Sequence, residues 1–272
     1  MKRLLFLFSL FACPLEAAPL ITEFQAVNHG PEVDDSGASS DWIEISNPDA
    51  EPVPLENWSL TDEADQPRKW VFPAVVLQAG ERLVVRASGR DRRVAGQPLH
   101  TNFSLEAAGE FLGLYPPAGP CISCWQRYPR QFSGISYGAG PGNVSGYFPV
   151  PTPGTTNDPD QRVDYVRDTQ FSVGRGFFTD PFAVSLTCRT PGGQIRYTVN
   201  GDVPTEASLL YTGPIPITTT TTLRVRAFQE EWLPSNTDTQ SYIFAATWKT
   251  QPDFAAGFST TWGQFNTSVK YR

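Results

Sequence analysis

The run Asp41-Trp42-Ile43-Glu44-Ile45-Ser46-Asn47 constrains the fold more than any other part of the chain. Its apolar and polar residues alternate with the two-residue period of a half-buried strand. Asn47-Pro48-Asp49 has the residues of a turn, and the alternation starts again in Trp58-Ser59-Leu60-Thr61-Asp62. Because Trp42 is out of phase with the two isoleucines, the pattern assigns Trp58 to the core and leaves Trp42 open. We therefore expect an all-β domain packed around four residues, Ile43, Ile45, Trp58 and Leu60.

Glycine and proline are frequent enough to indicate many turns. The 272 residues include 22 Gly and 25 Pro, and 40% of the residues are hydrophobic, which is enough for real cores. A chain of this length suits about two domains of ordinary size. Short strands separated by frequent turns are typical of β-sandwiches. The predicted fold class is therefore all-β, with two sandwich domains.

The first 18 residues have the pattern of a signal peptide. Lys2-Arg3 is basic, Leu4 to Leu15 is an apolar run, and small residues follow at Ala17-Ala18. The apolar run is too short to span a bilayer comfortably, so we expect no transmembrane segment. We predict a secreted or cell-surface (periplasmic) product. A lipoprotein anchored at Cys13 is the alternative, because Leu10-Phe11-Ala12-Cys13 resembles a lipobox.

The chain is acidic, with a formal net charge of −7. Removal of Lys2, Arg3 and Glu16 with the signal peptide lowers its 21 basic residues to 19 and its 28 acidic residues to 27. A nucleic-acid partner is not expected, because phosphate contacts need clustered Lys and Arg. The basic cluster Arg90 to Arg93 follows Gly89 and is interpreted as a solvated turn.

Three cysteines remain after the expected cleavage, Cys121, Cys124 and Cys188. In an oxidising compartment Cys121 and Cys124 either pair in a local disulfide or stay free, and Cys188 has no partner. Zinc is not expected, because it needs four ligands and the sequence offers no second cysteine pair or histidine cluster.

An acidic loop is the other candidate for a metal. Residues 28–41 contain Glu32, Asp34, Asp35 and Asp41. Calcium binds about six to eight oxygens, but the spacing of an EF-hand loop is absent. We interpret the loop as solvated, expect no cofactor, and keep Asp34, Asp35 and Asp41 as candidate calcium ligands.

The first half of the chain resembles a lamin tail domain over residues 19–118. The resemblance rests on Leu20-Ile21-Thr22-Glu23-Phe24, Asp41 to Asn47, Trp58 to Asp62 and Gly80-Glu81-Arg82-Leu83-Val84-Val85. It implies an immunoglobulin-like sandwich of the kind that bacteria carry in exported, multi-domain surface proteins. The family has no catalytic residues to transfer.

Residues 169–245 are similar to the chitobiase/β-hexosaminidase C-terminal domain. The motifs are Ile195-Arg196-Tyr197-Thr198, Asn200 to Thr205, Tyr211-Thr212-Gly213-Pro214-Ile215 and Leu223-Arg224-Val225-Arg226-Ala227. Asn200 and Val203 depart from the usual Asp-Gly-Ser-Xaa-Pro-Thr turn without preventing it. The resemblance implies a second immunoglobulin-like domain, which accompanies catalytic domains without being one.

Residues 119–168 are predicted to connect the two domains. They are rich in Pro, Gly and aromatic residues, and such rings either pack onto the domains or stack on sugars. The candidate carbohydrate contacts are Trp125, Tyr128, Tyr137 and Tyr147. The tail 246–272 is similar to a stretch that, in proteins of verrucomicrobium- and planctomycete-type bacteria, leads into a spore-coat-protein-H-like kinase domain. Kinase signatures are absent from this sequence.

The sequence contains few groups suited to catalysis. Its two histidines are His29 and His100, and Ser104 follows His100 without the Gly-x-Ser-x-Gly pattern. The paired carboxylates Asp34/Asp35 and Glu230/Glu231 are interpreted as surface charges. We therefore expect no enzyme but an exported adhesion, scaffold or carbohydrate-contact module, in contact with polysaccharide or cell-surface proteins. The alternatives are the N-terminal part of a larger surface protein with a kinase domain and, more distantly, a glycosidase.

Overall fold

The structure is a computed structural model that describes residues 18–30 and 32–244. The expected signal peptide up to residue 17, the lipobox cysteine Cys13 and the tail 246–272 lie outside the described residues. The chain divides into two compact units, Met1–Val163 and Asp164–Arg272. Among the described residues, no helix is long and apolar enough to cross a membrane.

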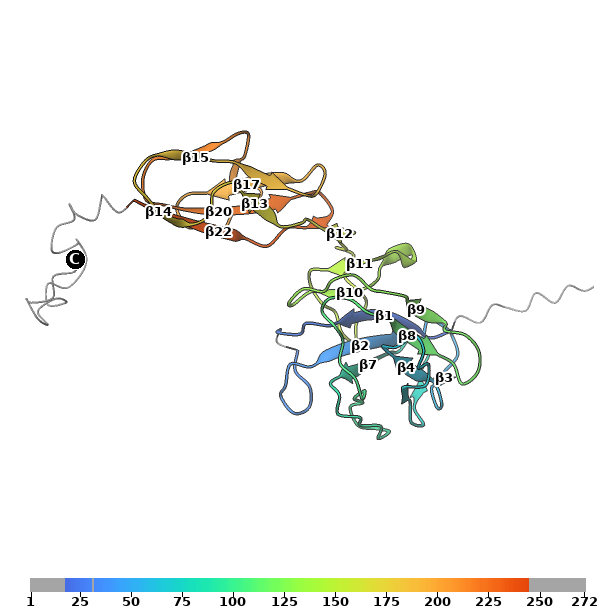
Figure 1. Cartoon of the computed structure of the whole chain (residues 1–272). Helices are drawn as coiled ribbons and strands as arrows, with labels where there is room; N and C mark the ends of the chain where they lie inside the picture. Colours follow the sequence, from blue (N-terminus) through green and yellow to red (C-terminus); the bar gives the residue numbers. More distant parts are fainter. Residues whose placement is uncertain (1–17, 31, 245–272) are drawn as a thin grey trace, which may run out of the picture. The chain divides into compact units, whose positions relative to one another are not determined.

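The first unit is built from antiparallel strands in two main sheets (Figure 1). One sheet has the order β11-β10-β1-β2-β7, and the other has the order β5-β4-β8-β9. The strands of the first sheet are β1 (Leu20–Gln25), β2 (Asp41–Ser46), β7 (Arg82–Ala87), β10 (Ser136–Ala139) and β11 (Ser145–Phe148). Those of the second are β4 (Ser59–Thr61), β5 (Trp70–Val71), β8 (Leu112–Tyr115) and β9 (Ser123–Trp125), and a separate pair is formed by β3 (Val53–Pro54) and β6 (Val76–Leu77).

Strand β2 lies between β1 and β7 in its sheet and is buried on both faces. Ile43 and Ile45 lie opposite Val85 and Leu83 of β7, and both isoleucines are fully buried, as the alternation predicts. Trp42 is also fully buried, and its indole N–H donates to Gln25 Oε1 over 2.9 Å. A strand between two neighbours is shielded along its edges, so burial follows once both faces are covered.

Trp58 is half-buried, so its assignment to the core is wrong. It directly precedes the short strand β4, where Ser59, Leu60 and Thr61 are all buried. The large fully buried tryptophans of this unit are instead Trp42 and Trp70. The two-residue period cannot reveal this, because Trp42 is on the strand face that a later part of the chain covers.

The cover of that face is the segment 149–157, which is held by two buried carboxylates. Glu44 Oε2 accepts from the Gly154 N–H over 2.8 Å. Glu23 accepts from the N–H and the hydroxyl of Thr152 over 3.0 and 2.7 Å. Glu23 and Glu44 are opposite each other on β1 and β2 and are fully buried. Burial raises the pKa of Glu23, despite hydrogen bonds that favour its ionised form.

The segment expected to connect the domains instead supplies strands β9, β10 and β11 to the first unit. Strand β10 pairs with β1 through Glu23↔Gly138 and Phe24↔Tyr137. At Gly138 a Cβ atom would lie 2.1 Å from the carbonyl oxygen of Thr22, so this close pairing requires glycine. The prediction of an irregular connector over 119–168 is therefore wrong for residues 123–148, whose aromatic side chains become part of a core.

The second unit has one five-stranded sheet with the order β14-β22-β20-β17-β18 (Figure 1). The strands of this sheet are β14 (Gly176–Phe178), β17 (Gln194–Thr198), β18 (Leu209–Leu210), β20 (Thr221–Phe228) and β22 (Asp238–Phe244). Three further pairs join β13 (Thr169–Phe171) with β16 (Leu186–Cys188), β15 (Phe182–Val184) with β19 (Ile215–Ile217), and β12 (Asp164–Tyr165) with β21 (Trp232–Leu233). The core between these layers contains Val184, Ile217, Leu223, Val225, Ala227 and Tyr242.

Candidate functional site

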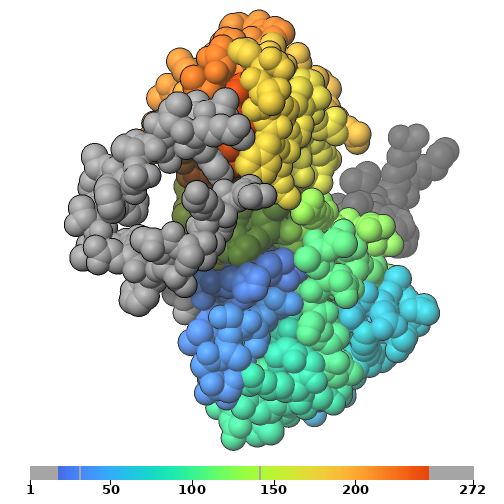
Figure 2. All heavy atoms as spheres, turned by 60° about the vertical axis from the view of Figure 1, so that its left-hand side comes forward, coloured from blue at the N-terminus to red at the C-terminus, as the bar shows by residue number. Residues whose placement is uncertain are grey.

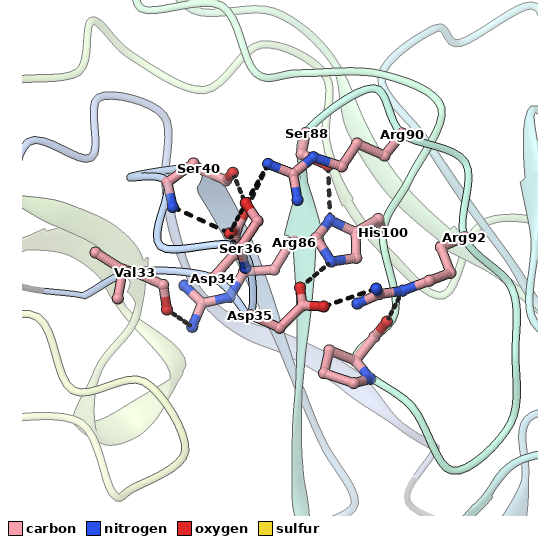
Figure 3. Close-up of polar contacts among 12 residues, drawn as sticks. Val33, Asp34, Asp35, Ser36, Ser40, Arg86, Ser88, Arg90, Arg92 and His100 are labelled. Atoms are coloured by element: carbon pink, nitrogen blue, oxygen red, sulfur yellow. Dashed lines mark hydrogen bonds and ion pairs between the residues drawn. The ribbon is translucent and has the colours of Figure 1, made fainter.

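A buried histidine joins two loops of the first unit. The chain after β7 turns back on itself, because the Arg86 N–H donates to Leu99 O and the Thr101 N–H donates to Arg86 O. This return places the fully buried His100 beside Ser88, with 2.7 Å between Ser88 Oγ and His100 Nδ1. On the other side of the ring, His100 Nε2 lies 2.9 Å from Oδ1 of Asp35 in the loop between β1 and β2 (Figure 3).

Arginines from the same return loop pair with the acidic loop. Arg92 Nη1 lies 2.7 Å from Asp35 Oδ2, and Arg90 Nη2 lies 3.1 Å from Asp34 Oδ2 (Figure 3). Figure 2 shows residues of these two parts of the chain, blue and blue-green, side by side on one face of the first unit. The interpretation of Arg90 to Arg93 as a solvated turn holds for the exposed Arg90 but not for Arg92, which is half-buried and paired with the acidic loop. We call Asp34, Asp35, Ser88, Arg90, Arg92 and His100 the loop cluster.

The loop cluster contains serine, histidine and aspartate in one hydrogen-bonded line. That order is the one used for nucleophilic catalysis, in which the histidine takes the serine proton and the carboxylate orients the ring. Acyl transfer also needs N–H donors free to hold the oxyanion. Here the N–H of Gly89 donates to Phe103 O over 3.1 Å and that of Asp91 to Thr101 O over 3.0 Å. The line is therefore better suited to holding the two loops together than to attacking a substrate.

No pattern in the sequence predicts that Ser88 is a hydrogen-bond partner of His100. Ser104, which is closer in sequence, is not the hydrogen-bond partner of His100. The other histidine, His29, is exposed, with Nδ1 3.1 Å from Ser133 Oγ. Since Ser88 and Asp35 are brought to His100 by a loop return and by strand pairing, no local sequence signal identifies the line.

Two of the three candidate calcium ligands lie together, with His100 as the third member of a possible metal-ligand group. Hydrogen bonds from Ser36, Ser40 and Ala38 outweigh the effect of burial and hold the pKa of Asp34 well below its usual range. A hydrogen bond from Arg92 lowers the pKa of Asp35 to about 2. Because guanidinium groups and N–H or O–H donors already occupy these carboxylate oxygens, the residues do not fit a calcium site.

Asp41, the third calcium candidate, does not join this group. It accepts a hydrogen bond from the Leu105 N–H over 3.2 Å. Burial raises the pKa of Asp41 to about 6, although backbone N–H groups favour the ionised form. This carboxyl group therefore belongs to the packing of the first unit.

The second unit carries an open groove of about 640 Å³ beside strands β17 and β20. Gln194 and Arg196 reach it from β17, and Phe228 reaches it from the end of β20. Its other lining residues are Gly192, Glu206, Gln229 and Glu230. Gln229 Oε1 is buried and has no hydrogen-bond partner in the part of the chain that the structure describes. The groove thus presents hydrogen-bonding side chains around one half-buried aromatic ring.

Comparison with protein families agrees with this two-unit structure. Residues 21–123 match the family model of the lamin tail domain, and residues 173–239 match that of the chitobiase/beta-hexosaminidase C-terminal domain. The chain carries these two domains in this order. The loop cluster lies within the lamin tail match, and the groove lies within the second match. Neither the comparison with curated proteins nor that with solved structures found a match.

Both family resemblances expected from the sequence are confirmed, and so is the all-β, immunoglobulin-like fold class. The lamin tail match ends at the first residue of β9, whereas the structural unit continues through β10 and β11. The lamin tail domain of this chain is therefore extended by two strands that complete its β1–β2–β7 sheet.

Three of the four aromatic residues proposed to stack on sugars are in the core of the lamin tail domain. Tyr128, Tyr137 and Tyr147 are buried, and Phe24 packs between Tyr128 and Tyr137 with ring centroids 4.8 and 5.8 Å away. These three rings are closed to a ligand, so their proposed role is wrong. Trp125 is half-buried, and its indole N–H donates to Ser145 Oγ over 3.2 Å.

The cysteines of the described chain differ in state. Cys121 and Cys124 are joined by a disulfide at the start of β9 in the lamin tail domain. Cys188 is a free thiol at the end of β16 in the second domain. Its Sγ lies 3.3 Å from Arg167 O. Both findings concern local structure and add no chemical group to the groove.

Proposed function

We propose that the chain is a non-catalytic, exported module that contacts polysaccharide through the groove of its second domain. The groove is the observation that carries the proposal. Sugars are bound by side-chain donors and acceptors around an aromatic ring, and the groove offers both through Gln194, Arg196 and Phe228. The name of the matched family, which mentions chitobiase and hexosaminidase, is in accord with a sugar polymer as partner.

The absence of catalysis is proposed on the chemistry of the described residues. In the loop cluster, the N–H groups near Ser88 are already bonded to carbonyl oxygens. In the groove, Glu206 and Glu230 are exposed, whereas the catalytic acid of a glycosidase lies in a hydrophobic pocket. Assays with chromogenic glycosides and esters should show no turnover. Turnover that disappears in Ser88→Ala or in Glu230→Gln would contradict this part of the proposal.

Export is proposed on the basic and apolar pattern of residues 1–18. The secreted chain should begin near Ala18 or Pro19 when its N-terminus is sequenced. A retained Met1 would argue against export through a signal peptide. A lipid on Cys13 would instead establish the anchored alternative.

Polysaccharide contact is tested by retention of the full chain on insoluble chitin, cellulose and peptidoglycan. We expect retention on at least one polymer, and we expect Phe228→Ala to reduce it, because a sugar ring loses its stacking surface. The matched control is Phe177→Ala, which removes an exposed ring from β14 outside the groove. Retention that is unchanged in Phe228→Ala would place the contact elsewhere. No retention on any polymer would favour a scaffold or adhesion role toward proteins.

A further inference from the structure

The outer face of strands β17 and β20 carries an arrangement of charge that packing does not explain. Ile195 of β17 and Val225 and Ala227 of β20 point into the core. Because side chains alternate along a strand, Arg196, Arg224 and Arg226 lie on the opposite face. Arg196 and Arg226 are directly opposite each other in the antiparallel register.

Placing like charges directly opposite on neighbouring strands is destabilising. Among the described residues, no carboxylate lies within 4.0 Å of any of these three guanidinium groups. Their hydrogen-bond partners are uncharged oxygens. Arg196 donates to Ser208 O and to Gln194 Oε1. Arg224 donates to Gly201 O, and Arg226 donates to Ser235 O. Arg224 Nε is buried and has no hydrogen-bond partner among the described residues. The three positive charges therefore have oxygen acceptors beside them but no carboxylate of the described protein.

Several arginines of the lamin tail domain, unlike these three, pair with carboxylates. Arg82 pairs with Glu44, Arg86 with Glu32, and Arg92 with Asp35. In a chain with a net charge of −7, acidic partners are plentiful. Arg68 of that domain also donates to carbonyl oxygens, those of Asn57 and Pro116. What distinguishes the face of β17 and β20 is that Arg196 and Arg226 lie directly opposite each other on neighbouring strands.

The arginine face continues into the groove. Arg196 belongs to both, and Phe228 lies opposite Gln194 at the end of β20. Arg226 lies over the Phe228 ring, 5.6 Å from its centroid. Glu206 and Glu230 line the same groove as Arg196, but among the described residues neither carboxylate lies within 4.0 Å of a guanidinium nitrogen of the three arginines. A ligand that fits would therefore present an acidic group to the arginines and hydroxyl groups to the rest of the groove.

We infer that this face binds a polysaccharide that carries acidic groups, either carboxylates or sulfate esters. The acidic group lies between Arg196 and Arg226, and a sugar ring lies against Phe228. A guanidinium group binds carboxylate and sulfate-like oxygens through two parallel N–H donors. Arg196 and Arg226, which are opposite each other, can both donate to one such acidic group. Arg224, two residues along β20, is roughly 7 Å from Arg226 and extends the face toward a second acidic group. The inference rests on the proposed polysaccharide contact and names its ligand class.

The test measures binding of the full chain to three soluble polymers: polygalacturonate for carboxylate, dextran sulfate for sulfate and dextran as the neutral polymer. The variant is Arg196→Gln with Arg226→Gln. The matched control is Arg175→Gln with Arg189→Gln, which removes the same charge from exposed side chains of the second domain outside β17 and β20. Circular dichroism establishes that each variant is folded.

We expect binding to one acidic polymer, with no binding to dextran. Binding should fall at least about tenfold in Arg196→Gln/Arg226→Gln, since a charge-assisted hydrogen bond contributes a factor of about ten or more. It should stay unchanged in the control and weaken when salt rises from about 0.05 to about 0.5 M.

Acidic-polymer binding that is equal in the Arg196→Gln/Arg226→Gln variant and the wild type would overturn the inference. Binding to neutral polymers alone would also overturn it, while leaving the proposed polysaccharide contact intact. Failure to bind any polymer, soluble or insoluble, would overturn both.

Discussion

Replacement of Trp42 by alanine should unfold or nearly unfold the lamin tail domain. Trp42 is fully buried, and removal of a buried tryptophan costs about 3–5 kcal/mol. Its indole N–H also donates to the buried Gln25 Oε1. In the alanine variant Gln25 Oε1 is left buried without this donor, which adds about 1–3 kcal/mol to the loss of folding stability. The sum is comparable with the whole stability of a small domain, about 5–15 kcal/mol.

Two further variants separate the ring from its hydrogen bond. Trp42→Phe keeps most of the buried ring and loses the N–H, so it should cost about 1–3 kcal/mol. Trp58→Ala is the matched control, because Trp58 is half-buried and has less apolar surface to expose. Its cost should be at least about 2 kcal/mol smaller than that of Trp42→Ala.

Urea unfolding of the full chain, followed by circular dichroism, gives these differences from the transition of the lamin tail domain. Scanning calorimetry separates that transition from the one of the second domain. The reasoning is refuted if Trp58→Ala costs as much as Trp42→Ala, because the covered face of β2 would then not be part of the core.

Three other changes test single contacts. Gly138→Ala should destabilise the lamin tail domain by about 2 kcal/mol or more, because its Cβ would meet Thr22 O, whereas Gly30→Ala, which has space, should be nearly neutral in the same melt. Asp41→Asn should raise the melting temperature at pH 7.5 and leave it nearly unchanged at pH 4. The raised pKa of about 6 means that the folded chain loses stability as pH rises from about 4 through 6, and the neutral amide escapes this loss of about 1–3 kcal/mol. His100→Ala should expose the 88–101 loop to proteolysis, because Ser88 and Asp35 lose their shared partner.

Each of these outcomes has a result that opposes it. Equal melts for Gly138→Ala and Gly30→Ala would mean that β10 does not approach β1 closely. A gain of stability in Asp41→Asn that is the same at pH 4 and pH 7.5 would contradict the raised pKa. Unchanged protease resistance in His100→Ala would mean that the loop is held by its backbone bonds alone.

The alternation of Asp41 to Ser46 predicted strand β2 correctly. The motifs at 80–85, 195–198 and 223–227, which carry the family resemblances, each overlap a strand of the structure. The same alternation left the burial of Trp42 open, because the cover of its face comes from a segment about a hundred residues later in the chain. A local period contains no information about such a long-range contact.

The candidate sites were less accessible to sequence reasoning for a similar reason. Strand pairing brings Arg196 opposite Arg226, although 29 residues separate them in the chain. The alternation in Leu223-Arg224-Val225-Arg226 indicates an outward-facing arginine pair, but not the third arginine beside it. In the connector, Gly and Pro suggested irregular chain, whereas Gly138 is required for a close strand pair.

The most direct test of the central claim is hydrogen–deuterium exchange of the full chain with and without the acidic polymer that it retains. The account predicts slower exchange in the peptides that cover β17 and β20 and in the Gln229–Glu230 stretch, with no change in peptides from the loop cluster. Protection confined to the lamin tail domain, or its absence from β17 and β20 while the polymer is bound, would contradict the claim that the second domain is the polysaccharide-binding part of this protein.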